Sequence, residues 1–301
     1  MLHFSPVTLE DKETIQRFFS KNTFRNCDFS FSNIFSWRHL YNTTFIAVDR
    51  SFLFIRFQAL DDLPGYLFPL GEGDVKMAIE QLMEDAEARH DEFRLYAVTP
   101  EMFDVIEQYM PGQFIYETDR AFYEYIYSSN DLIHLVGKKY QSKRNHIHKF
   151  KRTYDWEYLP VTREIIPDCL RLYNRWCAEN GGCNSERSLI EEGIATRQAF
   201  DNYEKLGLTG GALRINGEIL AYSYGQALTA DTFGVHAEKC LSEIDGGFAM
   251  MNQQFAEHNC ADYLYINREE DLGLESLRQA KMSYHPAILL EKGCVRRAIL
   301  S

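Results

Sequence analysis

The order of helix-like and strand-like segments occurs twice along this chain, and this repeated order constrains the fold more than any other feature. In each half, helical stretches with a periodic apolar face alternate with short runs of β-branched and aromatic residues. Helices are predicted at 74–89 and 246–258, for example, and strands at 93–98 and 262–267. The pattern predicts an α/β protein with mixed sheets, made of two similar domains at 1–129 and 130–301.

Two local signals place element boundaries in the second half. Asn216-Gly217 separates two strand-like runs and predicts a tight hairpin, because both residues tolerate a positive φ. Asp271 precedes an apolar-periodic stretch, and a side chain of this kind suits the N-cap position of a helix over 272–282.

Charge is distributed unevenly along the chain. Residues 1–129 hold 11 Lys or Arg against 21 Asp or Glu, whereas residues 130–301 hold 21 against 23. The stretch Lys138–Arg152 carries seven cations and no acid, although the formal net charge of the chain is −12. This distribution excludes a general nucleic-acid coat protein. It predicts either one local site for a polyanion or a solvated helix face.

The sequence also favours a cytoplasmic protein without a membrane span. The longest stretch free of Asp, Glu, Lys and Arg is Ile219–Ala230, 12 residues, against about 20 needed to cross a bilayer. The first residues show neither the basic nor the apolar region of a secretory signal. Seven cysteines without a CxxC pair indicate reduced thiols.

Two lysines fall on helix faces that otherwise carry apolar side chains. Lys143 shares a stripe with Tyr140, Ile147 and Phe150, at about 100° per residue. Lysine seldom faces a core without a partner, so Lys143 either extends outward along its stem or points into a cleft that binds an anion. Lys281 lies in the same way among the apolar residues of the predicted C-terminal helix.

Polar residues follow the strand predicted at 262–267. Open α/β sheets bind ligands at the carboxyl ends of strands, and Asn267-Arg268-Glu269-Glu270-Asp271 stands at such an end. With Asp271 assigned to a helix cap, Glu270 is the candidate general base or amine-binding carboxylate.

A turn with two glycines, Gly246-Gly247, opens the helix predicted at 246–258. Free N–H groups at a helix N-terminus suit a phosphate or the pyrophosphate of a thioester donor. The alternative is that Asp245 caps the helix and the glycines permit close packing. His146 and His148 point to opposite helix faces, so no metal site is predicted.

Several segments together resemble one bacterial family, that related to the C-terminal domain of lysylphosphatidylglycerol synthetase. More distantly, the chain is similar to Fem-type peptidoglycan aminoacyltransferases. The segments are Phe31–Trp37, Lys139–Phe150, His236–Lys239, Gly247, Asn252, Ile266–Leu274 and Leu277–Tyr284.

The resemblance implies a tandem pair of acetyltransferase-like (GNAT) domains and the transfer of an aminoacyl group from aminoacyl-tRNA to an amine or hydroxyl of a lipid headgroup or cell-wall precursor. It implies no required cofactor. Two alternatives are an N-acetyltransferase that uses acyl-CoA, and a member of the fold that only binds a ligand. From the resemblance and the residue patterns together we assign three sets of residues. The catalytic set is Glu270, Lys281 and Tyr284, the donor-binding set is Lys139, Lys143, Arg144, Gly246, Gly247 and Asn252, and the acceptor-binding set is His236, Glu238 and Asn267.

Overall fold

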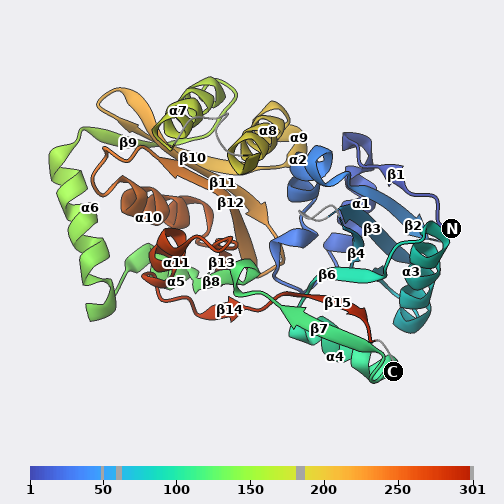
Figure 1. Ribbon diagram of the computed structural model, residues 1–301. Helices are drawn as coiled ribbons and strands as arrows, with labels where there is room; N and C mark the ends of the chain where they lie inside the picture. Colours follow the sequence, from blue (N-terminus) through green and yellow to red (C-terminus); the bar gives the residue numbers. More distant parts are fainter. Residues whose placement is uncertain (49–50, 59–62, 181–186, 299–301) are drawn as a thin grey trace. The chain divides into compact units, whose positions relative to one another are not determined.

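The computed structural model describes residues 1–48, 51–58, 63–180 and 187–298. The chain divides into two compact units (Figure 1). Unit 1 consists of Met1–Glu124, Glu270–Arg278 and Leu289–Ser301, and unit 2 of Tyr125–Glu269 and Gln279–Ile288. This division differs from the predicted second domain, 130–301, because two C-terminal segments belong to unit 1.

Unit 1 is built on one mixed sheet with the strand order β1-β2-β3-β4-β6-β15-β7, and β5 pairs with β3. Its only parallel pair among the described strands is β4 with β6. The strands are β1 (Ser5–Pro6), β2 (Thr44–Val48), β3 (Phe52–Gln58), β4 (Pro64–Leu67), β5 (Leu70–Gly71), β6 (Arg94–Val98), β7 (Phe114–Thr118) and β15 (Gly293–Arg297). The helices are α1 (Lys12–Phe19), α2 (Phe31–Tyr41), α3 (Val75–Arg89) and α4 (Pro100–Tyr109).

Local signals explain where helices of unit 1 begin. The Asp74 side chain accepts the N–H of Met77 at the start of α3, and Thr99 accepts the N–H of Met102 before Pro100 opens α4. Strand β15 lies between β6 and β7 and therefore joins the end of the chain to this sheet. Strand β15 was not predicted from the sequence, because Gly293–Arg297 is short and two of its five residues are charged.

Unit 2 carries the second sheet, in the order β14-β8-β13-β12-β11-β10-β9, with α7 and α8 on one face and α10 on the other (Figure 1). The strands of this sheet are β8 (Glu124–Ser128), β9 (Trp156–Pro160), β10 (Thr209–Ile215), β11 (Glu218–Ala227), β12 (Thr232–Cys240), β13 (Tyr265–Asn267) and β14 (Ile288–Leu290). Glu124 of β8 and Leu289 and Leu290 of β14 are counted with unit 1. The helices of unit 2 are α5 (Ser129–His134), α6 (Gln141–Thr153), α7 (Ile166–Glu179), α8 (Arg187–Asp201), α9 (Tyr203–Leu206) and α10 (Gly247–Asn259), while α11 (Glu275–Met282) crosses the division between the units.

Most predicted elements of unit 2 are confirmed. The hairpin of β10 and β11 turns at Asn216-Gly217, with φ of 50° and 90°. Tyr140, Ile147 and Phe150 are buried along the basic helix, and Lys143 is partly buried on the same face. Six of the seven cysteines lie in the described ranges, all as free thiols; Cys183 lies outside them.

The C-terminal helix is shorter than predicted. It begins at Glu275 rather than Leu272, because Leu272 and Gly273 have positive φ, 52° and 78°, which an α-helix excludes. Leu274, expected with Leu277 and Tyr284 on the apolar face, is 58% exposed, whereas Tyr284 is buried. The only buried residue of α11 is Lys281.

Candidate active site

The centre of the candidate site in unit 2 is the point where β12 and β13 separate. Their parallel pairing runs from Thr232↔Tyr265 to Gly234↔Asn267 and then stops. On the other side of β12 the register with β11 shifts, since Tyr224 pairs with Ala237 and Gly225 with Val235. His236 is the residue left unpaired by this bulge, and a bulge of this kind re-aims a side chain.

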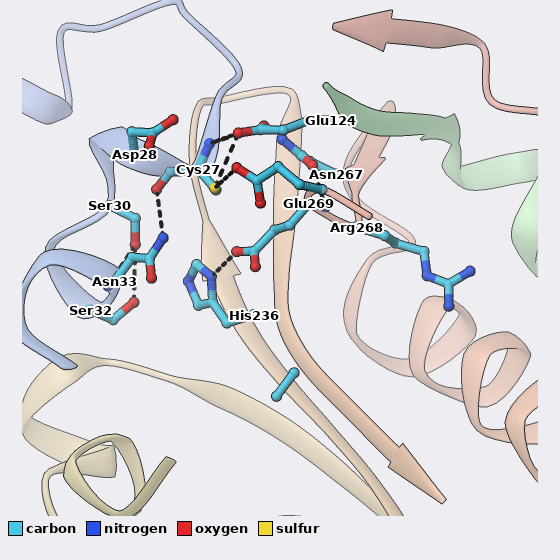
Figure 2. Close-up of polar contacts among 12 residues, drawn as sticks. Cys27, Asp28, Ser30, Ser32, Asn33, Glu124, His236, Asn267, Arg268 and Glu269 are labelled. Carbon is cyan, nitrogen blue, oxygen red and sulfur yellow. Dashed lines mark hydrogen bonds and ion pairs between the residues drawn. The ribbon is translucent and has the colours of Figure 1, made fainter. Parts of the chain in front are cut away.

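The imidazole of His236 is held by a carboxylate. Its Nδ1 lies 2.8 Å from Oε1 of Glu269 (Figure 2), and the two side chains are 8% and 20% exposed. An ionised carboxylate only accepts hydrogen bonds, so Nδ1 carries the proton and Nε2 holds the lone pair of the neutral ring. In the neutral ring this tautomer places the lone pair on Nε2, which is the kind of atom through which a histidine acts as a general base.

The loop Asn267–Glu269 has a specific backbone conformation. Glu269 adopts a φ of 58°, and its N–H donates to Oδ1 of fully buried Asn267 at 2.8 Å. The ammonium of Lys281 donates to the carbonyls of Arg268 and Glu269, at 2.6 and 3.1 Å. Lys281 was assigned a catalytic role from the sequence. In the structure it is 7% exposed and its ammonium binds the loop backbone.

A second polar group of unit 2 gathers around Arg268. Its guanidinium donates to Oε1 of Glu238 at 3.0 Å and lies 5.1 Å from the ring centre of Tyr284. The side-chain amide of Asn252 lies 3.4 Å from Glu238, and in its other orientation accepts from Arg268 at 3.3 Å. The structure therefore brings Glu238, Asn252 and Tyr284, predicted from sequence, to one place.

Lys143 joins this group. Its Nζ lies 4.0 Å from the ring centre of Tyr284 and donates to Oγ of Ser283 at 2.7 Å. Among the described residues, no carboxylate lies within ion-pair distance of its ammonium. Burial, and then the neighbouring charge of Arg268, lower the pKa of Lys143 to about 8. Two cations near a single carboxylate favour the binding of an anion.

Two other predicted phosphate ligands already have partners in the chain. Lys139 forms an ion pair with Asp131 at 3.1 Å. Arg144 donates to the carbonyls of Leu135 and Gly137, the latter at 2.7 Å, and so holds the segment before α6. These contacts give Lys139 and Arg144 a structural role within the chain, without any bound phosphate.

The glycine turn before α10 is closely packed rather than open. A Cβ on Gly246 would lie 2.6 Å from the carbonyl oxygen of His146, and one on Gly247 would lie 2.4 Å from Sγ of Cys240. The N–H groups of Ser242, Ile244, Asp245 and Gly247 already donate to groups of this chain. The turn thus follows the packing alternative, although Asp245 does not cap the helix but pairs with Lys149.

Glu270, the predicted general base, belongs to unit 1 and to a buried ion cluster. The ammonium of Lys292, 4% exposed, contacts Glu270, Oε1 of Glu124 at 2.6 Å and Oδ2 of Asp28 at 2.8 Å. The backbone N–H of Cys27 also donates to Glu124, as Figure 2 shows. These acids and the Cys27 thiol could hold a metal ion by their spacing, but Lys292 supplies the positive charge. The structure therefore places Glu270 in this ion cluster, where its carboxylate binds the ammonium of Lys292.

Asp271 is not a helix N-cap, contrary to prediction. It is fully buried, its Oδ1 accepts the N–H of Gly273 at 2.8 Å, and both oxygens accept from Arg278 at 2.8 and 3.0 Å. Its carboxylate fixes the turn that precedes α11 by an internal ion pair.

Sequence reasoning missed Glu269, Arg268 and Lys292. Glu269 and Arg268 lie inside the predicted run 267–271. Their different partners, His236 for Glu269 and Glu238 for Arg268, depend on the positive φ of Glu269, which no residue type in the run indicates. Lys292 gave no signal, because its three carboxylate partners come from distant segments.

The fold defines a class of protein. Each unit has a mixed sheet that contains a parallel pair, β4 with β6 in unit 1 and β12 with β13 in unit 2, and the same fold occurs in a tandem GNAT protein from the clavulanic acid biosynthesis pathway (TM-score 0.50, 9% identity, 100% of both chains). FemX shares it with a TM-score of 0.65 at 8% identity over 97% of both chains. The chain is therefore a tandem GNAT-like protein, as predicted.

The chain belongs to the family described as phosphatidylglycerol lysyltransferase, C-terminal, whose model matches residues 20–295. A conserved protein of unknown function from Bacteroides thetaiotaomicron is 44% identical, with a TM-score of 0.94 over 99% of this chain and 100% of that one. The C-terminal domain of a putative lysylphosphatidylglycerol synthetase from Agrobacterium fabrum is 13% identical, with a TM-score of 0.67 over 96% of this chain and 91% of that one.

A curated relative, an uncharacterised protein of Mycoplasmoides gallisepticum, is 24% identical over 178 residues. The match covers 57% of this chain and 55% of that protein, so the chain spans about half the length of the curated relative it matches. In the described ranges, every helix is too short or too polar to cross a bilayer.

Proposed function

We propose that this chain is a GNAT-fold acyltransferase that takes an aminoacyl group from aminoacyl-tRNA and transfers it to an amine or hydroxyl. The observation that carries the proposal is the His236–Glu269 pair at the point where β12 and β13 separate. Family membership supports the class of reaction, since the family is described by a lysyltransferase.

The proposed reaction needs one base and one anion site. The acceptor N–H or O–H loses its proton to Nε2 of His236 as its heteroatom attacks the ester carbonyl. The new C–N or C–O bond forms, the bond from the carbonyl carbon to the ribose oxygen breaks, and that oxygen takes the proton back from the imidazolium. Lys143 and Arg268 would bind a phosphate of the donor.

The turn before α10 favours tRNA over acyl-CoA as the donor. A pyrophosphate at this helix N-terminus would need free N–H groups, and four of the turn's N–H groups are already engaged. Acyl-CoA is therefore the second candidate, and no cofactor is required in the main proposal.

The outer face of α6 suits the backbone of a nucleic acid. A hollow of about 440 Å³ is lined there by Asn145, His148, Lys151 and Arg152. Within the described part of the chain, no carboxylate pairs with Lys151 or Arg152. We assign the tRNA phosphates to this face, rather than to Lys139 and Arg144.

The acceptor is an amine or hydroxyl of a lipid headgroup or cell-wall precursor. We place the protein in the cytoplasm, where aminoacyl-tRNA is found. Of the acceptor residues assigned from sequence, His236 is given the base role, Asn267 supports the loop of Glu269, and Glu238 holds Arg268.

The first experiment is a thermal-shift panel with aminoacyl-tRNA, uncharged tRNA, acetyl-CoA and CoA. A ligand present at 100 times its Kd stabilises the folded state by about 2.7 kcal/mol. We expect a shift with both tRNA samples and none with either CoA compound. A shift with acetyl-CoA alone would establish the second candidate instead.

The tRNA face is tested by the salt dependence of binding. Each phosphate contact contributes about 0.7–0.9 to the slope of log K against log salt. The double variant Lys151→Gln/Arg152→Gln should flatten this slope by about 1.4–1.8, whereas the control Lys21→Gln/Lys76→Gln, two exposed lysines of unit 1, should leave it unchanged. Equal slopes in the two double variants would remove α6 from the proposal.

A further inference from the structure

Lys281 contacts the backbone carbonyls of Arg268 and Glu269, the two consecutive residues whose side chains form the two polar groups of the candidate site. Its Nζ donates to the carbonyl of Arg268 at 2.6 Å and to that of Glu269 at 3.1 Å. The side chain of Arg268 leads to Glu238 and the ring of Tyr284. The side chain of Glu269 leads to His236.

The backbone at this place does not hold its conformation by itself. Glu269 has a φ of 58°, a region that a residue with a Cβ adopts only when its surroundings impose it. The carbonyl of Glu269 also accepts the N–H of Tyr125 at 3.2 Å, and the N–H of Arg268 donates to the carbonyl of Tyr125 at 2.9 Å. Lys281 adds the charged donor to this set.

The helix that carries Lys281 is itself anchored. The hydroxyl of Tyr127 donates to the Lys281 carbonyl at 2.8 Å, and the N–H of Tyr284 donates to the same oxygen at 3.1 Å. The lysine is 7% exposed and 5.6 Å from the ring centre of Tyr125. A buried ammonium is costly unless its donors are used, and here they are used on the loop.

We propose that Lys281 is a positioning residue for both groups. By fixing the consecutive backbone carbonyls of Arg268 and Glu269, it positions the His236 imidazole with its Glu269 carboxylate and also the Arg268 guanidinium. It acts through these residues and does not touch the reacting atoms. This positioning role goes beyond the proposed function. It rests on that function only in so far as His236 is the base and Arg268 is a phosphate ligand.

The test reads both groups without any ligand. Long-range ¹H–¹⁵N spectra of the His236 ring report which nitrogen carries the proton, and the Nε–H signal of Arg268 reports its ion pair; His236→Gln and Arg268→Lys assign the two signals. In Lys281→Met we expect the single Nδ1–H tautomer to be lost and the Arg268 signal to broaden or vanish. Lys138→Met, an exposed lysine of the same unit, should change neither signal.

Two further variants distinguish an effect of Lys281 on both groups from changes that are confined to one of them. Glu269→Gln should change the His236 signal only, and Glu238→Gln the Arg268 signal only, whereas Lys281→Met should change both. A folded Lys281→Met with both signals as in the wild type, or with one changed, would overturn the proposal.

If Lys281→Met does not fold, Lys281→Gln takes its place, because its amide can still donate to one carbonyl. We then expect at least one signal to change, and two unchanged signals would overturn the proposal. Failure of the proposed function has a different signature. It would appear as absent tRNA binding in the wild type, while these spectra stay as predicted.

Discussion

Removing the ammonium of Lys292 should destabilise unit 1 more than any other single loss of a lysine charge that we can identify in the described chain. Lys292 is 4% exposed and contacts Asp28, Glu124 and Glu270. Burial lowers its pKa, but the three carboxylates raise it further, so the pKa stays well above its usual value. In Lys292→Met the carboxylates keep their charges in a buried place without a cation.

The expected magnitude follows from that geometry. Breaking a buried ion pair by removing one partner costs about 3–5 kcal/mol, because the remaining charge is uncompensated. For a unit of about 150 residues, each kcal/mol lowers Tm by roughly 2–4 °C, so we expect a fall of roughly 6–20 °C. The control Lys76→Met removes an exposed lysine that pairs with Glu80 at 3.8 Å, and should cost less than about 0.5 kcal/mol.

The pH dependence gives the sharper test. Burial raises the pKa of Glu124 to about 7 in the folded state, against about 4.3 for a glutamate in an unfolded chain. The folded state then binds the extra proton between these values, so the contribution of Glu124 to stability is full below about pH 4 and is lost as the pH rises through 7. Without Lys292 this loss should steepen and extend above pH 7.

The assay is urea unfolding of the wild type, Lys292→Met and Lys76→Met at pH 5 and pH 8, followed by tryptophan fluorescence and circular dichroism. The deficit of Lys292→Met should be full at pH 8 and less than half as large at pH 5. The double variant Lys292→Met/Glu124→Gln should recover part of the loss at pH 8. A deficit under about 1 kcal/mol, or one that is equal at both pH values, would refute the ion-cluster reasoning.

Three further predictions concern single residues of the candidate site and its surroundings. Burial lowers the pKa of Lys143 to about 8, so tRNA affinity should fall as the pH rises from 7 to 9, and Lys143→Met, which has no ammonium to lose, should abolish that fall in a binding titration. Gly246→Ala should cost about 1–3 kcal/mol in chemical unfolding, since Gly246 has a φ of 78° and the new Cβ would meet the His146 carbonyl at 2.6 Å; Gly217→Ala, with positive φ but open space, is the control and should cost less. Asp271→Asn should cost about 2–3 kcal/mol rather than the roughly 1 kcal/mol of a lost helix cap, because Arg278 loses its buried partner, and a smaller loss in the same unfolding assay would restore the cap interpretation.

Most helices, the hairpin and the class of fold could be predicted from the sequence alone. Apolar periodicity is a local property, so α3, α6 and α10 and the hairpin at Asn216-Gly217 were readable along the chain. The partly buried place of Lys143 followed from the helical angle alone. The motifs that carry the resemblance also predicted the family correctly.

The roles of the charged residues, in contrast, depend on contacts between segments that are distant in sequence. Glu269 and Glu270 are neighbours of one type, and the sequence offered no means to tell which binds His236 and which binds Lys292. The answer depends on a positive φ at Glu269, a residue whose carbonyl accepts hydrogen bonds from Lys281 and Tyr125 elsewhere in the chain. The place of β15 is also decided by distant contacts, because this strand joins the sheet of unit 1 through pairing with β6 and β7, both far away in sequence. Local propensity fixes an element, whereas the partner of a charge or of an edge strand is set by which distant segments the fold brings within a few ångströms.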